Sequence, residues 1–94
     1  MKVKVKGYLT FKRSIGEQIL EFTDQEAVTL RELLVRISLG HQPADSLFNG
    51  DTGTVDHRAV ILVNGRHHSH LPDQLDTLLK DGDEVAVFPP LAGG

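Results

Sequence analysis

The chain has no cysteine among its 94 residues. Without cysteine it cannot form disulfides, thiolate zinc sites, iron–sulfur clusters or a thiol nucleophile. The sequence also lacks the patterns GxGxxG, GxxxxGKS/T, HExxH and GxSxG, which are typical of dinucleotide sites, P-loops, zinc peptidases and serine hydrolases. Any sulfur or redox chemistry must therefore use other atoms, and an enzyme with one of these active sites is not indicated.

Long apolar runs are missing as well. The longest one, Ala59–Val63, is far shorter than the roughly 18 residues that a membrane-spanning helix needs. The first residues, Met1–Lys4, alternate with lysine instead of forming the apolar stretch of a signal peptide. We therefore expect a cytoplasmic protein that does not enter a membrane.

Charge of one sign is not in large excess. Ten basic and thirteen acidic residues give a net charge of −3, and 39% of the residues are hydrophobic. This composition is ordinary for one globular domain, and a domain of this size has little room for an enclosed pocket. We therefore expect the function to lie on the surface. We expect no nucleic-acid partner, because the few clustered basic residues lie on a domain that is acidic overall.

Two strands are expected near the N-terminus. Side chains from residue 3 to residue 9 alternate between apolar and polar, as in a half-buried strand. A second strand, Glu17–Phe22, would follow through a short hairpin. The first strand would carry Val3, Val5, Gly7 and Leu9 on its core face and Lys2, Lys4, Lys6 and Tyr8 on its other face. We interpret the lysines as a solvated sheet face that steers the chain toward an acidic partner surface.

One amphipathic helix is expected to cover the sheet. Thr29 and Glu32 have the spacing of a capping box, so the helix begins at Leu30 and ends at Gly40. Its apolar stripe consists of Leu30, Leu33, Leu34 and Ile37. The segment after the helix, His41–His57, is interpreted as a long connection.

The second half of the chain adds further strands. The run Ala59–Val63 predicts a central strand that turns back at Asn64-Gly65, a strong hairpin signal. One further helical turn is expected over Leu75–Leu79, and a tight turn over Lys80–Asp83. The sequence thus predicts one α+β unit, in which a mixed sheet of four to five strands wraps around one main helix.

The end of the chain is its most distinctive part. A final strand, Glu84–Phe88, is stopped by Pro89-Pro90, because proline donates no ladder hydrogen bond. The side chains then become small, in Leu91-Ala92-Gly93-Gly94. Glycine has no Cβ and can pass through a narrow channel, so the active site of another protein could close around the last residues. Activation of the terminal carboxylate and attack by sulfide would give a thiocarboxylate, which holds reactive sulfur without cysteine.

These residues resemble the ubiquitin-like β-grasp sulfur carriers of the MoaD/ThiS type. The resemblance rests on residues 81–94, on the helix from Thr29 to Gly40 and on the turn Val63-Asn64-Gly65. The ending FPP-x-x-GG is most similar to that of molybdopterin synthase small subunits. The long connection over residues 41–57 departs from the shorter carriers.

The resemblance implies a β-grasp domain over residues 1–88 and a flexible reactive tail over residues 89–94. It implies that an E1-like adenylyltransferase uses ATP to adenylate Gly94, which is then converted to a thiocarboxylate. The tail would enter a large synthase subunit that moves the sulfur onto a pterin precursor, in molybdenum cofactor biosynthesis. The chain itself would be no enzyme, with no catalytic side chain and no bound cofactor.

The candidate site residues follow from these expectations. Gly94 is the acyl site. Gly93 would let the chain end pass through the narrow channel to the partner's active site. The candidate partner-binding residues are Tyr8, Phe88, Pro89, Pro90, Leu91 and Ala92. If Val85 and Val87 face the core, Phe88 lies on the opposite face beside the tail, where the family has a docking aromatic. Alternatively, Phe88 packs against Tyr8 or Leu20 on its own surface.

His67, His68 and His70 could suggest a metal site, because imidazole is a common zinc ligand, but their pattern does not favour one. In an extended chain His68 and His70 can converge while His67 turns away, and no cysteine or carboxylate pattern completes a ligand set. We interpret them as a solvated hairpin arm, with His41 and His57 as loop residues. No metal is expected.

Several alternatives stay open. The chain could carry sulfur for thiamine, cysteine or tungsten-pterin synthesis, or act as a ubiquitin-like modifier that joins Gly94 to lysine amines. A rival of another class is a β-grasp protein-binding module with an inert tail, which uses the 41–57 connection or the histidine arm. The sequence names neither the pathway, nor the activating enzyme, the acceptor or the oligomeric state.

Overall fold

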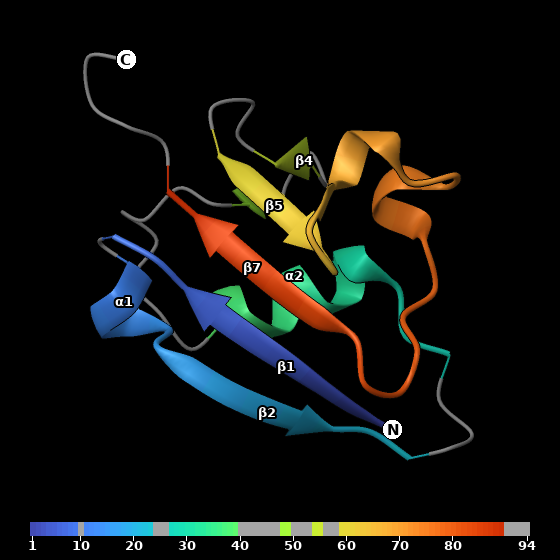
Figure 1. Ribbon diagram of the computed structural model, residues 1–94, viewed down its shortest axis with the longest axis horizontal. Helices are drawn as coiled ribbons and strands as arrows, with labels where there is room; N and C mark the ends of the chain where they lie inside the picture. Colours follow the sequence, from blue (N-terminus) through green and yellow to red (C-terminus); the bar gives the residue numbers. More distant parts are fainter. Residues whose placement is uncertain (10, 24–26, 40–47, 50–53, 56–58, 90–94) are drawn as a thin grey trace.

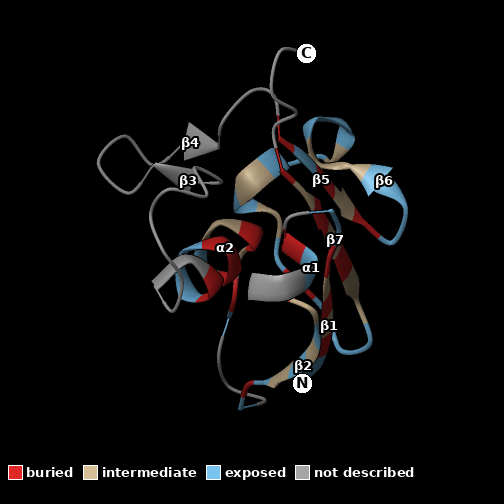
Figure 2. Ribbon diagram, turned by 90° about the vertical axis from the view of Figure 1, so that its left-hand side faces the viewer, coloured by how far each residue is buried: buried red, intermediate tan, exposed pale blue. Residues whose placement is uncertain are grey.

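The computed structural model of the chain describes residues 1–9, 11–23, 27–39, 48–49, 54–55 and 59–89. Five strands form one mixed sheet, and a helix lies across one of its faces (Figures 1 and 2). The main elements are β1 (Lys2–Gly7), β2 (Glu17–Glu21), α2 (Leu30–Leu39), β5 (Val60–Val63), β6 (Arg66–His67) and β7 (Glu84–Phe88). The shorter ones are α1 (Phe11–Ser14), β3 (Phe48–Asn49), β4 (Thr54–Val55), η2 (His68–His70) and η3 (Gln74–Asp76). The predicted α+β fold is confirmed.

The strand order of the sheet is β2-β1-β7-β5-β6, which places β7 in the centre. β7 runs parallel to β1, with Val5 opposite Val85, and antiparallel to β5. Parallel neighbours need a crossover connection, and here the chain between β2 and β7, including α2, provides it. The last strand therefore lies beside the first one, as Figure 1 shows.

The core lies between the sheet and α2 (Figure 2). Val3 and Val5 of β1 and Val85 and Val87 of β7 are fully buried. The helix contributes its predicted stripe, Leu30, Leu33, Leu34 and Ile37. Burial of a side chain of this size stabilises a fold by about 1.5–3 kcal/mol. This burial also fixes which residues of each strand face the other, uncovered side of the sheet.

The start of α2 is capped as predicted. The amide of Glu32 donates to Thr29 Oγ1 over 3.2 Å, and the same hydroxyl donates to the Glu32 carboxylate over 3.3 Å. The amide of Leu30 donates to the carbonyl of Thr77 over 3.0 Å, which ties the helix start to the segment before β7. The helix continues to Leu39, and Gly40 lies outside the described residues.

The predicted pairing of β1 with a second, antiparallel strand is confirmed, but the connection is longer than the short hairpin expected, because it contains the helical turn α1. Leu9 does not continue the core face of β1. Its φ is 56° and its side chain is 57% exposed, because the backbone turns there. Phe11 enters the core instead, and Gly7 permits this close approach, since a Cβ on Gly7 would lie 2.5 Å from the carbonyl oxygen of Phe11.

Two expectations in the second half also need correction. The 41–57 segment contains the antiparallel pair β3 and β4, so it is not wholly irregular. The further helical turn is the 3-10 turn η3, which ends before Leu78. Leu78 instead forms an extended bridge to Thr29 and is 55% exposed, while Leu79 is buried. The spacing of Leu75, Leu78 and Leu79 fits a helix. The chain is extended at Leu78 because backbone contacts of Thr77 and Leu78 join it to the start of α2.

The two predicted turns beside β7 are confirmed and are joined to each other. Asn64 and Gly65 have φ values of 52° and 83°, as a two-residue hairpin turn between β5 and β6 requires. Asp83 closes the second turn by donating its amide to the carbonyl of Lys80 over 3.0 Å. Its carboxylate accepts from Asn64 Nδ2 over 2.9 Å and from the amide of Lys80 over 2.7 Å. We call these contacts the Asn64–Asp83 clamp.

Within the described ranges, no helix is both long and apolar enough to span a bilayer.

Candidate functional site

The predicted tail leaves the fold from the centre of the sheet. The end of β7 is held on both sides, because the amide of Tyr8 donates to the carbonyl of Val87 over 3.0 Å and Val60 pairs with Phe88. Pro89, the first predicted tail residue, is buried, so the fold includes it. The other tail residues, Pro90, Leu91, Ala92, Gly93 and Gly94, lie outside the described residues, and their assigned roles stay predictions.

Phe88 and Tyr8 form a stacked pair at this exit. Their ring centroids are 4.5 Å apart and the planes differ by 8°. Both rings lie on the sheet face away from α2, as the burial of Val85 and Val87 on the opposite face requires. The expected contact of Phe88 with its own surface is therefore present, to Tyr8. Since Tyr8 is still 37% exposed, the pair also offers an aromatic surface to a partner.

Three further apolar residues extend this surface, and none of them was among the predicted partner-binding residues. The antiparallel register pairs Val60 with Phe88 and Leu62 with Ala86, so all of these side chains share one face. Val60 is 36% exposed, and Leu62 and Ala86 are half-buried. We call Tyr8, Val60, Leu62, Ala86 and Phe88 the docking face. Alternation within the run from 60 to 63 could have indicated two of them, but the pairing partner could not be read from local sequence.

The three lysines of β1 lie on the same sheet face, and each faces a carboxylate. Nζ–Oε1 distances are 3.7 Å for Lys2 to Glu21, 2.9 Å for Lys4 to Glu17 and 3.4 Å for Lys6 to Glu84. The hydrogen bond and charge of Glu17 raise the pKa of Lys4, and Lys4 in turn lowers the pKa of Glu17. The predicted lysine stripe is therefore largely neutralised within the sheet.

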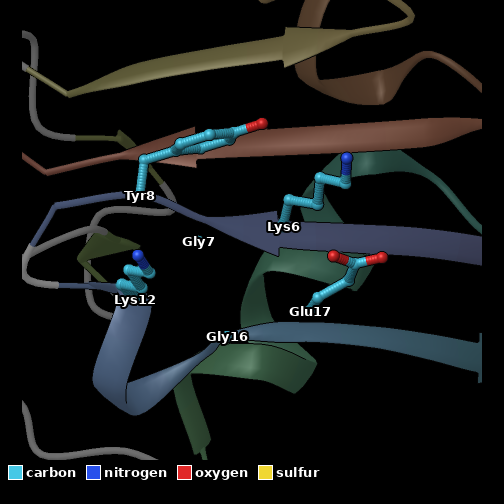
Figure 3. Close-up of a pocket in the computed structure, with 6 residues that line it drawn as sticks. All are labelled: Lys6, Gly7, Tyr8, Lys12, Gly16 and Glu17. Carbon is cyan, nitrogen blue, oxygen red and sulfur yellow. The ribbon is translucent and has the colours of Figure 1, made fainter.

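An open pocket of about 400 Å³ adjoins the docking face at Tyr8 (Figure 3). It lies between the end of β1, α1 and the start of β2. Its lining residues are Lys6, Gly7, Tyr8, Lys12, Gly16 and Glu17. The exit of the tail, an apolar face and a polar pocket thus meet at one end of the sheet.

Comparisons with known proteins identify the family of the chain. Residues 10–94 match the ThiS family. The chain belongs to the ThiS family. It is 31% identical to small archaeal modifier protein 3 of Haloferax volcanii and 29% identical to the molybdopterin synthase sulfur carrier subunit of Chlamydomonas reinhardtii, and both alignments cover 100% of each chain. The solution structure of the Haloferax volcanii HVO 2177 protein is 33% identical, with a TM-score of 0.76, over 100% of this chain and 87% of that one.

The ThiS family consists of small ubiquitin-like carrier and modifier proteins, and the fold of this ThiS-family chain is the β-grasp. The predicted resemblance to MoaD/ThiS carriers is confirmed. The docking face lies at the end of β7, the last strand before the predicted tail.

The histidines of this ThiS-family chain lie at the far edge of the sheet, and their predicted arrangement is wrong. His67 does not turn away: its ring stacks on that of His68, with centroids 4.5 Å apart, and lies 6.1 Å from that of His70. The reason is the 3-10 turn η2, where an extended arm was expected. His67 Nδ1 caps this turn by accepting from the amide of Ser69 over 3.2 Å. Among the described residues, no group of three or more histidines and carboxylates is placed to hold a metal ion.

His68 is partly buried, as His67 is, whereas His70 is exposed. Burial lowers its pKa, and the neighbouring His67 adds to this shift. Its Nδ1 atom is buried and has no hydrogen-bond partner among the described residues. The neutral ring is therefore the form that the fold accommodates.

A second open pocket, also of about 400 Å³, lies at the opposite end of the sheet from the tail exit. Leu78, Arg66 and Lys80 are among its lining residues, next to the Asn64–Asp83 clamp. The side chain of Lys80 is exposed there. This pocket supplies matched control positions for experiments on the docking face.

Proposed function

We propose that this ThiS-family chain carries sulfur as a thiocarboxylate on Gly94 and donates it in molybdopterin synthesis. The observation that carries the proposal is that β7, the last strand before the predicted tail, is the central strand and ends directly beside the exposed docking face. The full-length match to a molybdopterin synthase sulfur carrier subunit supports the choice of pathway. A cytoplasmic location stays a prediction.

The proposed chemistry needs two steps at the Gly94 carboxylate. A carboxylate oxygen attacks the α-phosphorus of ATP on an E1-like adenylyltransferase, which forms the acyl adenylate and releases pyrophosphate. Hydrosulfide then attacks the acyl carbon, and AMP leaves with the electron pair of the C–O bond. The product is a thiocarboxylate and a proton, and no side chain of the carrier takes part in either step.

The proposed partners would use the docking face. An aromatic and aliphatic surface that is rigidly held is the kind of surface on which binding energy concentrates. We propose that the adenylyltransferase and the large synthase subunit both cover Tyr8 and Phe88, because both enzymes must receive the same tail. Gly93 would then lie in the channel that leads to each active site, with Pro90, Leu91 and Ala92 in contact with its walls.

Intact mass spectrometry tests the proposal. The chain is incubated with an E1-like enzyme, ATP and a sulfide donor, and its mass should rise by the difference between one sulfur and one oxygen atom. A variant without Gly93 and Gly94 should fold and bind the same partners but show no change in mass. The proposal is refuted if the full chain also stays unchanged with an enzyme that thiocarboxylates another ThiS-family carrier.

A second candidate is protein modification, which the 31% identity to an archaeal modifier protein favours. In this case a lysine amine attacks the acyl adenylate, AMP leaves and an isopeptide bond forms. Since Lys80 is the last site for trypsin, residues 81–94 would stay attached to each modified lysine. Peptides with this remnant would show that the chain is conjugated to proteins. If such peptides are absent under activating conditions, protein modification is excluded and sulfur transfer remains as the proposed function.

The rival of another class, a binding module with an inert tail, makes the opposite prediction for the deletion. If the tail is inert, removing Gly93 and Gly94 leaves function in a cell unchanged. Loss of molybdoenzyme activity in a strain with only the deleted form, restored by the full chain, would exclude an inert tail.

A further inference from the structure

The pocket beside Tyr8 contains an ammonium group that no described carboxylate neutralises. Among the described residues that line the pocket, Glu17 is the one acidic residue, and its Oε1 lies 2.9 Å from Lys4 Nζ. Lys6 is held 3.4 Å from Glu84. The side chain of Lys12 is exposed and has no partner among the described residues. The pocket therefore keeps a net positive charge from Lys12.

The fold holds Lys12 next to Tyr8 through backbone contacts. The amide of Lys12 donates to the carbonyl of Leu9 over 3.0 Å, at the start of α1. Because Gly7 has no side chain, α1 can lie directly against β1. The amide of Gly7 also donates to the carbonyl of Gly16 over 2.7 Å. Gly16 has a φ of 61°, a conformation that favours glycine. Figure 3 shows Lys12 and Tyr8 at the same end of the group of lining residues, with Lys6 and Glu17 at the other end.

We propose that this pocket receives a carboxylate side chain of the enzyme that activates the tail. The carboxylate would pair with Lys12 Nζ, with the Tyr8 ring beside it as the wall shared with the docking face. This inference rests on the proposed function and adds a polar contact to the apolar docking surface. The occupant follows from charge, because an unpaired cation at the rim of an apolar contact favours an acidic partner residue.

Such a contact acts mainly on binding. An exposed ion pair strengthens binding only modestly and is screened by salt. Charge complementarity at a rim chiefly raises the association rate, and it does not touch the reacting acyl group. Lys12 should therefore change the KM of the carrier in the activation reaction and leave kcat unchanged.

The test is steady-state kinetics of an E1-like enzyme with the carrier as the varied substrate, read by pyrophosphate release. K12E should raise KM roughly threefold to tenfold at low salt, with kcat unchanged, and the effect should shrink toward none as salt rises. K80E is the matched control, because it reverses an exposed lysine at the opposite pocket. It should behave as the wild type, and circular dichroism checks that both variants fold.

Carbodiimide cross-linking provides a direct second readout. It should join Lys12 Nζ to an Asp or Glu of the enzyme as an amide, which peptide mass spectrometry identifies, and K12R should abolish that cross-link while keeping KM. The inference is overturned if the wild type is activated but K12E has an unchanged KM, or if K12E impairs only the later transfer to an acceptor. If the wild type itself is not activated, the proposed function fails, and this inference fails with it.

Discussion

At the scale of single residues, the stacked pair of Tyr8 and Phe88 links the fold to the proposed docking. The rings cover each other at 4.5 Å and close the end of the central strand, while their outer surface stays open. The same side chains therefore contribute to stability and, in the proposed function, to partner binding. Experiments on them must separate the two effects.

Replacing Phe88 with alanine should lower the free energy of unfolding by about 1–3 kcal/mol, from lost burial and lost stacking. Urea denaturation measures this change. Ile19 is the control, because it lies on the same sheet face but is 61% exposed, and I19A should cost less than about 0.5 kcal/mol. Equal stability of the two variants would contradict the assigned packing of Phe88.

His68 predicts a dependence of stability on pH. Burial lowers its folded-state pKa below the ordinary value of 6.5, so the unfolded chain binds a proton more readily. The contribution of the neutral ring is complete above pH 6.5 and is lost as the pH falls through the lower folded-state pKa. Unfolding free energies measured between neutral and acidic pH should fall less steeply for H68Q than for the wild type. An identical slope would show that His68 does not titrate as inferred.

At the scale of elements, α1 and the Asn64–Asp83 clamp hold the two ends of the sheet. α1 packs Phe11 into the core and sets the pocket beside Tyr8, which depends on the missing side chain of Gly7. The clamp joins the β5–β6 hairpin to the start of β7. α1 thus holds β1 in place, and the clamp holds β5 and β7, the strands that carry most of the docking face.

Gly7→Ala should destabilise the chain by about 1–3 kcal/mol, because the new Cβ would lie 2.5 Å from the Phe11 carbonyl oxygen and 2.8 Å from Ile15 Cβ. Thermal or urea unfolding measures the loss. K12A, a change to an exposed side chain in the same connection, should stay within about 0.5 kcal/mol of the wild type. A neutral G7A would mean that α1 does not lie against β1 as described.

Asp83→Ala should cost about 0.5–1.5 kcal/mol, since it removes the hydrogen bonds that Asn64 Nδ2 and the Lys80 amide donate to this carboxylate. D73A is the matched control, because Asp73 makes no side-chain cap for η3 and is exposed. Hydrogen exchange should show faster exchange of the Asn64 amide in D83A alone. Unchanged exchange there would argue against the clamp.

At the scale of the whole molecule, the two faces of the sheet have separate tasks. α2 covers one face and buries the core, and the other face carries the docking residues (Figure 2). Val60 on the docking face and Val35 on α2 are each 36% exposed, which makes them a matched pair. They test whether partner binding is confined to one face.

Val60→Glu should weaken binding to the activating enzyme by roughly tenfold or more, because it places a charge within the apolar contact. V35E should bind as the wild type does, since α2 faces away from the docking face. Calorimetry or surface plasmon resonance measures both affinities. Equal loss in both variants would place the contact elsewhere.

The sequence predicted those parts of the molecule that depend on local patterns. β1, α2 and β7 follow from alternation, a capping box and a proline stop within a few residues, and the Asn64-Gly65 turn follows from its own backbone needs. The share of Val60 and Leu62 in the docking face depends on the register between strands far apart in the sequence. The four residues of α1 are too few to show a helical period. The stacking of His67 on His68 depends on a 3-10 turn that carries no clear signal.

The central position of β7 has a mechanical consequence. An enzyme that draws the tail into a deep active site pulls on the end of this strand, along the direction of the chain. Hydrogen bonds to β1 on one side and to β5 on the other resist that pull together, in shear, so no single bond can open first. An edge strand, which is paired on one side alone, would separate from its neighbour under a smaller force, so we expect the central β7 to keep its pairing while the tail is bound.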